Sequence, residues 1–251
     1  MDAVDAVSVL VAAPECTALF LDFDGTLAAI VPEAAAARPL PGVPDLLRRL
    51  SARFGRVAVV SGRPVGFLLE HLGPEVELHG LYGLEGWVDG ALRTHPDAER
   101  WRPVVAEAVA AARRDLPHAV DVEDKGLSLT LHFRQAPDAA STVAAWAGAA
   151  SSSSGLEVRS AKMSVELHPP VEVDKGTVVS ERSAGMAAVA YVGDDEGDLP
   201  AFEALDELAA AGCRTVRVAV DTAEVSPRLR AAADHTVAGP EGAVAFLQSL
   251  T

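Results

Sequence analysis

Cysteine is scarce in this sequence: only Cys16 and Cys213 occur among its 251 residues. Two cysteines form at most one disulfide, so the chain does not have the disulfide framework of a small secreted domain. Neither cysteine lies in a metal-ligand spacing. We therefore interpret both as small apolar residues of the core.

Long apolar runs and basic residues are also lacking. No apolar run reaches the length of a membrane span, and residues 1–13 carry Asp2 and Asp5 but no basic residue, unlike a secretory signal. Only 21 Lys and Arg stand against 36 Asp and Glu, a net charge of −15. Such a surface repels nucleic acid and anionic membranes. We expect a cytoplasmic monomer that binds a small molecule, with neither nucleic acid nor membrane as a partner.

Hydrophobic residues make up 49% of the chain, enough for a sizeable core. Short apolar runs alternate with helical patterns at both ends of the sequence, which favours an α/β fold with a doubly wound, mostly parallel sheet. The predicted strands are 18–21, 57–60, 77–79, 187–192, 215–220 and 235–237. A hairpin is predicted at 85–93, turning at Asp89-Gly90.

The middle of the chain has a different pattern, helix-strand-strand twice over, which is typical of an antiparallel α+β module. We predict helices at 97–115 and 137–150, a flexible serine connector at 151–154, and strands at 119–123, 127–133, 156–159 and 163–167. The sequence thus predicts an α/β core from residues 1–93 and 170–251, with an α+β domain inserted at 94–169.

Two carboxylates emerge where the first strand ends, in the motif Asp22-Phe23-Asp24-Gly25. Open α/β sheets bind ligands at the carboxyl ends of their strands. Two negative charges placed there are costly unless a cation joins them, and Mg²⁺ prefers such oxygen ligands. Aspartate also acts as a nucleophile toward phosphoryl groups. An ordinary Asp-rich turn is the alternative.

A second acidic cluster follows the strand at 187–192 and contains Asp194, Asp195 and Asp198. If the two strand ends lie side by side, at least three carboxylates converge on one point, which requires a metal ion. A solvated turn is again the alternative, although two such clusters at two strand ends make it less attractive.

Phosphate binding also requires hydrogen-bond donors. Ser61-Gly62 lies between a strand and a helix opened by Pro64, where a hydroxyl, free N–H groups and the helix dipole suit an oxyanion. Lys175, in the first turn of its helix, would place an ammonium on the same phosphate. Taken alone, the Ser-Gly pair could be a helix cap and the lysine a solvated surface residue.

The order Asp22-x-Asp24-Gly25-Thr26, Ser61, Lys175 and Gly193-Asp194-Asp195 with Asp198 resembles the haloacid dehalogenase superfamily of phosphotransferases. The insertion resembles that superfamily's larger cap domain, which determines substrate specificity. Among the families of this superfamily, the chain resembles the trehalose-6-phosphate phosphatases. The resemblance lies in these segments: Gly80 to Glu85, Glu123-Asp124-Lys125, Leu127 to Leu129, His132-Phe133-Arg134 and Glu166 to Pro169. One departure is that Gly197 and Leu199 replace the family's usual Thr and Glu beside Asp198.

The resemblance implies a Mg²⁺-dependent phosphatase for trehalose 6-phosphate. It implies Asp22 as nucleophile, Asp24 as acid and base, Ser61 and Lys175 as phosphate ligands, and metal ligands from Asp22, Asp24, Asp194, Asp195 and Asp198. The substrate would contact Gly62, Arg63, Glu123, Lys125, Arg134 and Glu166. Charged groups pair strongly with sugar hydroxyls, although exposed ion pairs are the alternative in the cap. Rival functions are a phosphatase for sucrose 6-phosphate or a mannosyl-phosphoglycerate, and a catalytically silent sugar-phosphate-binding relative.

Overall fold

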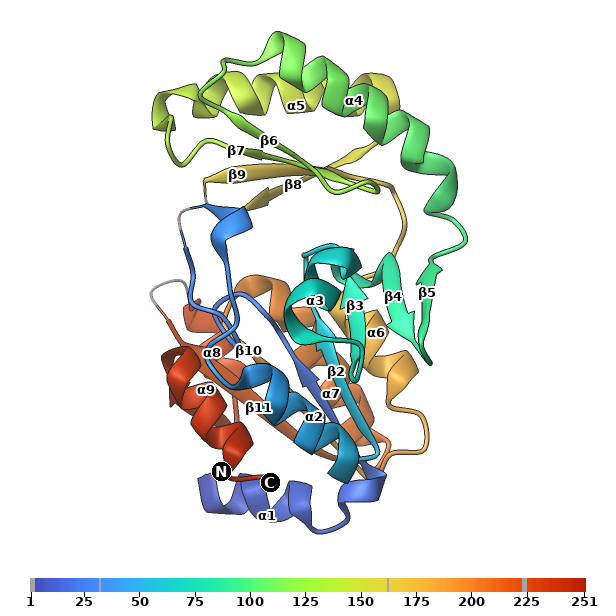
Figure 1. Ribbon diagram of the computed structural model, residues 1–251, viewed down its shortest axis with the longest axis vertical. Helices are drawn as coiled ribbons and strands as arrows, with labels where there is room; N and C mark the ends of the chain where they lie inside the picture. Colours follow the sequence, from blue (N-terminus) through green and yellow to red (C-terminus); the bar gives the residue numbers. More distant parts are fainter. Residues whose placement is uncertain (1–2, 32, 162, 223–224) are drawn as a thin grey trace. The chain divides into compact units, whose positions relative to one another are not determined.

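The computed structural model describes residues 3–31, 33–161, 163–222 and 225–251. The chain forms two compact units (Figure 1). The core unit comprises Met1–Arg93 and Val173–Thr251, and the insert unit comprises Thr94–Glu172. Asp2, part of the N-terminal pattern considered above, lies outside the described residues.

An eight-stranded sheet forms the centre of the core unit. The sheet order is β12 (His235–Ala238), β11 (Arg214–Asp221), β10 (Ala188–Gly193), β1 (Thr17–Leu21), β2 (Arg56–Val60), β3 (Glu77–Gly80), β4 (Glu85–Val88) and β5 (Ala91–Thr94). Neighbouring strands from β12 to β3 are parallel, and β4 pairs antiparallel with β3. β4 and β5 are joined through Asp89-Gly90, both with positive φ, as a type I′ hairpin turn requires.

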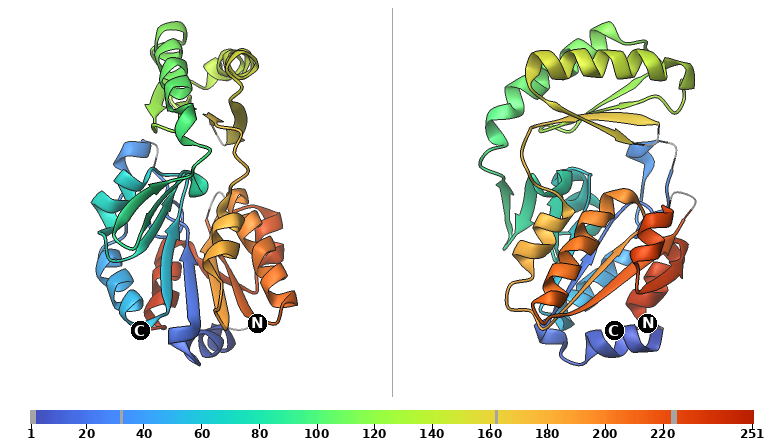
Figure 2. Two further views of the ribbon diagram at one scale, coloured as in Figure 1. Left: turned by 90° about the vertical axis from the view of Figure 1, so that its right-hand side faces the viewer. Right: turned by 180° about the vertical axis from the view of Figure 1, so that it is seen from behind.

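Helices cover both faces of this sheet (Figure 2). Side chains alternate along β1, so Leu19 and Leu21 pack into one apolar cluster while Ala18 and Phe20 pack into the other. The first cluster includes α1 (Ala3–Val11), α2 (Val43–Arg53), α3 (Val65–Leu72) and α9 (Gly239–Gln248); the second includes α6 (Lys175–Arg182), α7 (Leu199–Ala210) and α8 (Pro227–Ala232). Burial on both faces explains why these strands read as continuous apolar runs.

Short 3₁₀ helices lie at several connections. They are η1 (Pro14–Cys16), η2 (Ala34–Ala36), η3 (Leu81–Gly83), η4 (Glu99–Trp101), η5 (Pro137–Ala139) and η6 (Glu196–Asp198). Within the described part of the chain, no helix combines the length and apolarity that crossing a bilayer would require.

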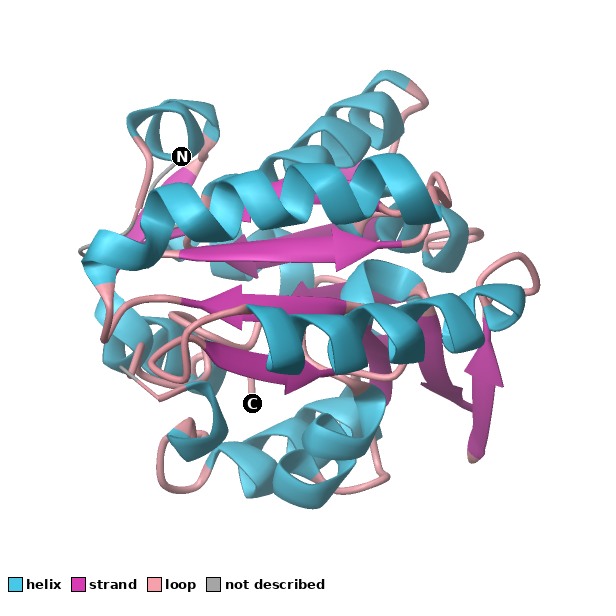
Figure 3. Cartoon of the chain, turned by 90° about the horizontal axis from the view of Figure 1, so that it is seen from above, coloured by secondary structure: helices cyan, strands magenta, loops and turns pink. Residues whose placement is uncertain are grey.

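The insert unit is a four-stranded antiparallel sheet with two helices on one face; Figure 3 views it from the helix side. The sheet order is β6 (Asp121–Asp124), β7 (Leu129–His132), β9 (Ser164–His168) and β8 (Glu157–Ala161), and the helices are α4 (Arg102–Asp115) and α5 (Ala140–Ser154). Leu129, Leu131, Val165 and Leu167 pack against the helices. The alternating residues therefore form a polar face on the other side of the sheet.

Both helix predictions for the insert unit need correction. The helix expected from residue 97 begins at Arg102, after η4, with Pro103 in its first turn, where proline is well tolerated. The prediction of a flexible connector at 151–154 is wrong, because these serines form the last turn of α5. Hydroxyls of Ser152 and Ser154 donate to the carbonyls of Gly148 and Ala150, and Gly155 ends the helix in the left-handed conformation.

The interpretation of both cysteines as core residues is wrong for Cys16, whereas Cys213 packs against the second apolar cluster. Cys16 is exposed and Cys213 is half-buried, and both are free thiols. Cys16 ends η1 just before β1, where the chain has not yet entered the sheet. The α/β fold class itself is confirmed, with its mostly parallel sheet and its separate antiparallel insert.

A network of ion pairs connects the last residue of α6 to the sheet. Glu77 accepts hydrogen bonds from Arg182 at 2.8 and 3.0 Å and from Arg56 at 2.9 Å, and His79 lies 3.5 Å away. Burial alone would raise the pKa of Glu77, but the nearby His79 and the hydrogen bonds from Arg182 and Arg56 outweigh burial and hold that pKa far below its usual range. The ionised carboxylate therefore stabilises the fold.

We predict that Glu77→Gln lowers the free energy of unfolding at pH 7 by about 2 kcal/mol, since two arginines lose their counter-ion in a partly buried place. The pKa of Glu77 is lower in the folded protein than in the unfolded chain. The stabilisation by its carboxylate is therefore present above about pH 4.5 and is lost as the pH falls toward the pKa of the folded protein. Urea unfolding at pH 7 and pH 4 measures both effects. The exposed ion-pair variant Asp45→Asn is the control and should leave the urea midpoint unchanged; a Glu77→Gln midpoint equal to that of the control contradicts the prediction.

Candidate active site

The two acidic clusters meet at the centre of the core sheet. β1 and β10 are parallel neighbours, with Leu21 opposite Val192. The N–H of Asp22 donates to the Val192 carbonyl at 2.9 Å, so Asp22 and Asp194 leave adjacent strands at the same edge. This is the carboxyl edge of the sheet, where α/β folds bind ligands.

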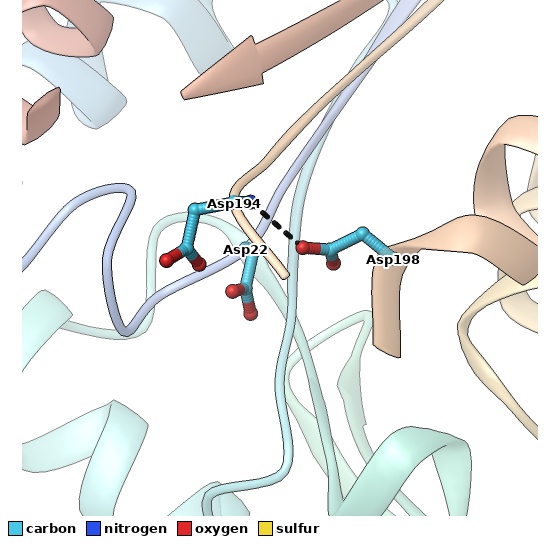
Figure 4. A group of neighbouring side chains, drawn as sticks. All are labelled: Asp22, Asp194 and Asp198. Carbon is cyan, nitrogen blue, oxygen red and sulfur yellow. Dashed lines mark hydrogen bonds between the residues drawn. The ribbon is translucent and has the colours of Figure 1, made fainter. Parts of the chain in front are cut away.

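Three carboxylates converge there. Oxygens of Asp22, Asp194 and Asp198 all lie within 4.8 Å of one another, and all three residues are buried (Figure 4). The Asp194 carboxylate also accepts a hydrogen bond from Thr222 Oγ1 at 3.0 Å. A solvated turn, the alternative considered for both motifs, does not fit such burial.

Lys175 supplies a positive charge to this cluster. It is the first residue of α6, and Asp174 caps that helix by accepting from the Thr177 N–H. The Lys175 ammonium lies 2.8 Å from Asp22 Oδ1 and 2.6 Å from Asp198 Oδ1, and the residue is only 3% exposed. Burial alone would lower the pKa of Lys175, but Asp198 and Asp22 outweigh it and raise that pKa well above its usual value. The lysine is therefore part of the site.

Asp198 holds the neighbouring groups in place. Its Oδ1 accepts from Lys175 and from the Tyr191 hydroxyl at 2.6 Å, while its Oδ2 accepts from the N–H groups of Asp194 and Asp195. Both oxygens are thus already engaged. Sequence reasoning missed Tyr191, because an aromatic residue within a buried strand reads only as core.

The cluster carries three carboxylates and one ammonium. Burial raises the pKa of Asp22 well above its usual value despite the opposing charge of Lys175, and Asp198 and Asp194 raise it further. Burial, followed by the charges of Asp198 and Asp195, raises the pKa of Asp194 to about 8. Carboxylates that resist ionisation in this way favour an added cation, and their oxygens suit a hard divalent metal.

Two glycines make this close approach possible. A Cβ on Gly25 would lie 2.0 Å from Asp194 Oδ2, and the φ of Gly25 is +76°. A Cβ on Gly193 would lie 2.3 Å from Asp198 Cγ. Side chains at these positions would push the carboxylates apart.

The other two acidic residues of the motifs lie apart from this group. Asp195 is exposed and caps η6 by accepting from the Gly197 N–H. Both oxygens of Asp24 accept hydrogen bonds from Arg63, at 2.7 Å each. Of the five candidate metal ligands, the structure therefore brings together the side chains of three.

Ser61 lies at the end of β2, the other neighbour of β1. It is buried, and its Oγ accepts from the Arg63 N–H at 3.2 Å. Gly62 lies close to Tyr82, whose hydroxyl would be 2.7 Å from a Cβ at this position. Ser61 and Gly62 thus lie at the same edge of the sheet as the acidic residues.

The insert unit has a polar cluster of its own. Glu166 Oε1 accepts from Ser128 Oγ at 2.6 Å and lies 3.6 Å from the Lys125 ammonium, and both charged side chains are buried. Glu123 pairs with His132 at 2.8 Å. Lys125 directly follows the last residue of β6. Arg134 is exposed in the segment after β7.

The chain is similar to several known proteins. A protein-family model for trehalose-phosphatase matches residues 20–233. Over 200 residues the chain is 36% identical to the trehalose-phosphate phosphatase of Mycobacterium avium (strain 104), which covers 75% of this chain and 51% of the relative. The chain thus spans about half the length of the curated relatives it matches.

Two solved structures share the fold. The C-terminal domain of C. albicans trehalose-6-phosphate phosphatase aligns over 100% of this chain and 96% of its own, with a TM-score of 0.78 and 21% identity. A trehalose-6-phosphate phosphatase related protein covers 93% of this chain and 95% of its own, with a TM-score of 0.77 and 23% identity.

We predict that Mg²⁺ binds more tightly at pH 8.5 than at pH 6.5 and that binding releases protons. A metal ion needs ionised carboxylates, and the pKa of Asp194 lies near 8, so affinity should fall below that pH by up to about tenfold per pH unit for each proton released. Calorimetry in buffers of different ionisation enthalpy measures both quantities. Asp194→Asn, the control, should abolish binding; an affinity independent of pH, without proton release, contradicts the prediction.

Proposed function

Because the chain belongs to the trehalose-phosphatase family, we propose that it is a Mg²⁺-dependent phosphatase that hydrolyses trehalose 6-phosphate to trehalose and phosphate, the last step of trehalose biosynthesis. The observation that carries this proposal is the buried group of Asp22, Asp194 and Asp198 around Lys175 at the carboxyl edge of the sheet. Hard oxygen donors of this kind suit Mg²⁺.

The first half-reaction transfers the phosphoryl group to the protein. An Asp22 oxygen attacks phosphorus, and the bond to the sugar oxygen breaks as Asp24 gives that oxygen a proton. Asp22, Asp194 and the backbone carbonyl of Asp24 would hold Mg²⁺, which when bound supplies positive charge that offsets the phosphate oxygens and orients the phosphorus. In this scheme Asp22 becomes an aspartyl-phosphate.

The second half-reaction returns the protein to its starting state. Asp24, now a carboxylate, takes a proton from water as the water oxygen attacks phosphorus, and the bond to Asp22 breaks. Ser61 and Lys175 hold the remaining phosphate oxygens through both steps. The positions of both residues support these roles. Ser61 directly follows β2, the strand next to β1, and the Lys175 ammonium lies 2.8 Å from Asp22 Oδ1.

The insert unit would select the sugar. Glu123, Lys125, Glu166 and Arg134 offer charged groups that form strong hydrogen bonds with hydroxyls, and Gly62 and Arg63 would contact the substrate from the core. The mutual pairing of Lys125 with Glu166 supports this role, because paired groups are held in fixed positions before the sugar binds. We also propose a cytoplasmic monomer, consistent with the net charge of −15.

We predict that Asp22→Asn abolishes turnover without weakening the fold. The amide cannot attack phosphorus, and it removes a buried carboxylate whose raised pKa marks it as costly to ionise in the fold. Thermal unfolding in metal-free buffer should show a Tm no lower than that of the wild type. Phosphate release above background by this variant would remove Asp22 as nucleophile.

The test of the proposed substrate is phosphate release from trehalose 6-phosphate beside sucrose 6-phosphate, glucose 6-phosphate and a mannosyl-phosphoglycerate, with Mg²⁺ and with EDTA. We expect the highest kcat/KM for trehalose 6-phosphate and no release with EDTA. A higher value for another sugar phosphate would reassign the substrate, and no release from any phosphate ester would favour a silent binding protein.

We predict that Lys125→Met lowers kcat/KM for trehalose 6-phosphate by about 10- to 100-fold, the loss of one or two charged hydrogen bonds. The value for p-nitrophenyl phosphate, which has no sugar, should stay within twofold. Arg114→Met, at the exposed end of α4 in the same unit, is the control and should change neither value. Equal losses on both substrates would argue against a sugar contact.

A further inference from the structure

The Arg63 side chain contacts Asp24, Ala34 and Phe67. Its Nε and one terminal nitrogen donate to the two Asp24 oxygens at 2.7 Å each, and the other terminal nitrogen donates to the Ala34 carbonyl at 2.7 Å. Its guanidinium also lies 4.8 Å from the centre of the Phe67 ring. A planar group held in this way cannot rotate without losing several contacts at once.

The contact with Asp24 is bidentate, which fixes the plane of the carboxylate as well as its place. The Arg63 side chain is only 11% exposed, whereas that of Asp24 is 36% exposed. Arg63 therefore contacts the Asp24 carboxylate from its buried side, and water can reach the carboxylate from its exposed side.

We propose that Arg63 is a positioning residue that holds the Asp24 side chain in one orientation, from which Asp24 acts as base in the second half-reaction. This inference rests on the proposed function through the role of Asp24. It gives Arg63 a task different from the substrate contact expected from the sequence.

In the second half-reaction, water hydrolyses the aspartyl-phosphate. The water oxygen forms a bond to phosphorus, and the bond between phosphorus and the Asp22 oxygen breaks, returning its electron pair to the Asp22 carboxylate. One water proton moves to an Asp24 oxygen. Phosphate leaves, and loss of that proton from Asp24 restores the starting state.

An aryl phosphate separates the two half-reactions. The p-nitrophenolate leaving group needs no proton, so the first half-reaction proceeds without Asp24 as acid, and kcat/KM reports that step. Hydrolysis of the aspartyl-phosphate still needs the base. Loss of Asp24 orientation should therefore lower kcat and KM together and leave their ratio unchanged.

The experiment is stopped-flow and steady-state kinetics of p-nitrophenyl phosphate hydrolysis with Arg63→Gln. We expect kcat to fall at least about tenfold, because a positioned base contributes about 10²–10⁴-fold. KM should fall by the same factor, kcat/KM should stay within twofold, and a burst of product should approach one equivalent per active site. KM does not depend on the folded fraction of a preparation, so partial misfolding cannot imitate this result.

Three comparison variants accompany it. Asp24→Asn, which removes the base, should show the same signature with a larger fall in kcat. Arg38→Gln removes an arginine that contacts the Ala35 and Ala37 carbonyls beside η2 without touching Asp24, and it should match the wild type. Arg63→Lys keeps the charge but cannot form the bidentate contact, so it should recover only part of kcat.

Other outcomes overturn the inference. A fall in kcat/KM without a burst would place Arg63 in phosphate binding or transfer, and unchanged kinetics would show that Asp24 needs no support. Full recovery by Arg63→Lys would mean that charge alone suffices. A wild type that hydrolyses p-nitrophenyl phosphate but not trehalose 6-phosphate refutes only the substrate, whereas a wild type inactive on every phosphate ester refutes the function and this inference with it.

Discussion

The structure of the candidate site depends on a buried excess of negative charge. Asp22, Asp194 and Asp198 lie within 4.8 Å of one another with the ammonium of Lys175 as their direct counter-ion. Without a further cation, burial and mutual repulsion raise the pKa values of Asp22 and Asp194. A fold that keeps this arrangement accepts a local electrostatic cost, which is the situation expected where a metal and a phosphate are to be bound.

The surrounding fold keeps these charges in place through groups that do no chemistry themselves. Parallel pairing of β1 with β10 sets the separation of the two acidic motifs, and Gly25 and Gly193 allow the carboxylates to approach. Asp198 joins Tyr191, Lys175 and the backbone after β10 into one buried network. This network supports Asp198 although Gly197 and Leu199 depart from the usual residues beside it. A buried polar network of this kind is stable only when each member has its partners.

The sequence was sufficient to predict the sheet and the meeting of the acidic motifs, because both follow from apolar runs that end in Asp and Gly at parallel strand ends. The sequence was not sufficient where the same residues suit two local structures or where a contact depends on side-chain conformation. Ser151–Ser154 end α5 because their hydroxyls find helix carbonyls, whereas serine in sequence reads equally well as a linker. The contact of Arg63 with Asp24 depends on η2 and on side-chain rotamers, which no local pattern records.

The most direct test of the account is the position of a bound metal. Crystals of the protein soaked with Mn²⁺, a substitute for Mg²⁺, should give one strong anomalous peak within bonding distance of carboxylate oxygens of both Asp22 and Asp194. An anomalous peak elsewhere, or none at these carboxylates at saturating Mn²⁺, would contradict the claim that the two strand ends share one cation.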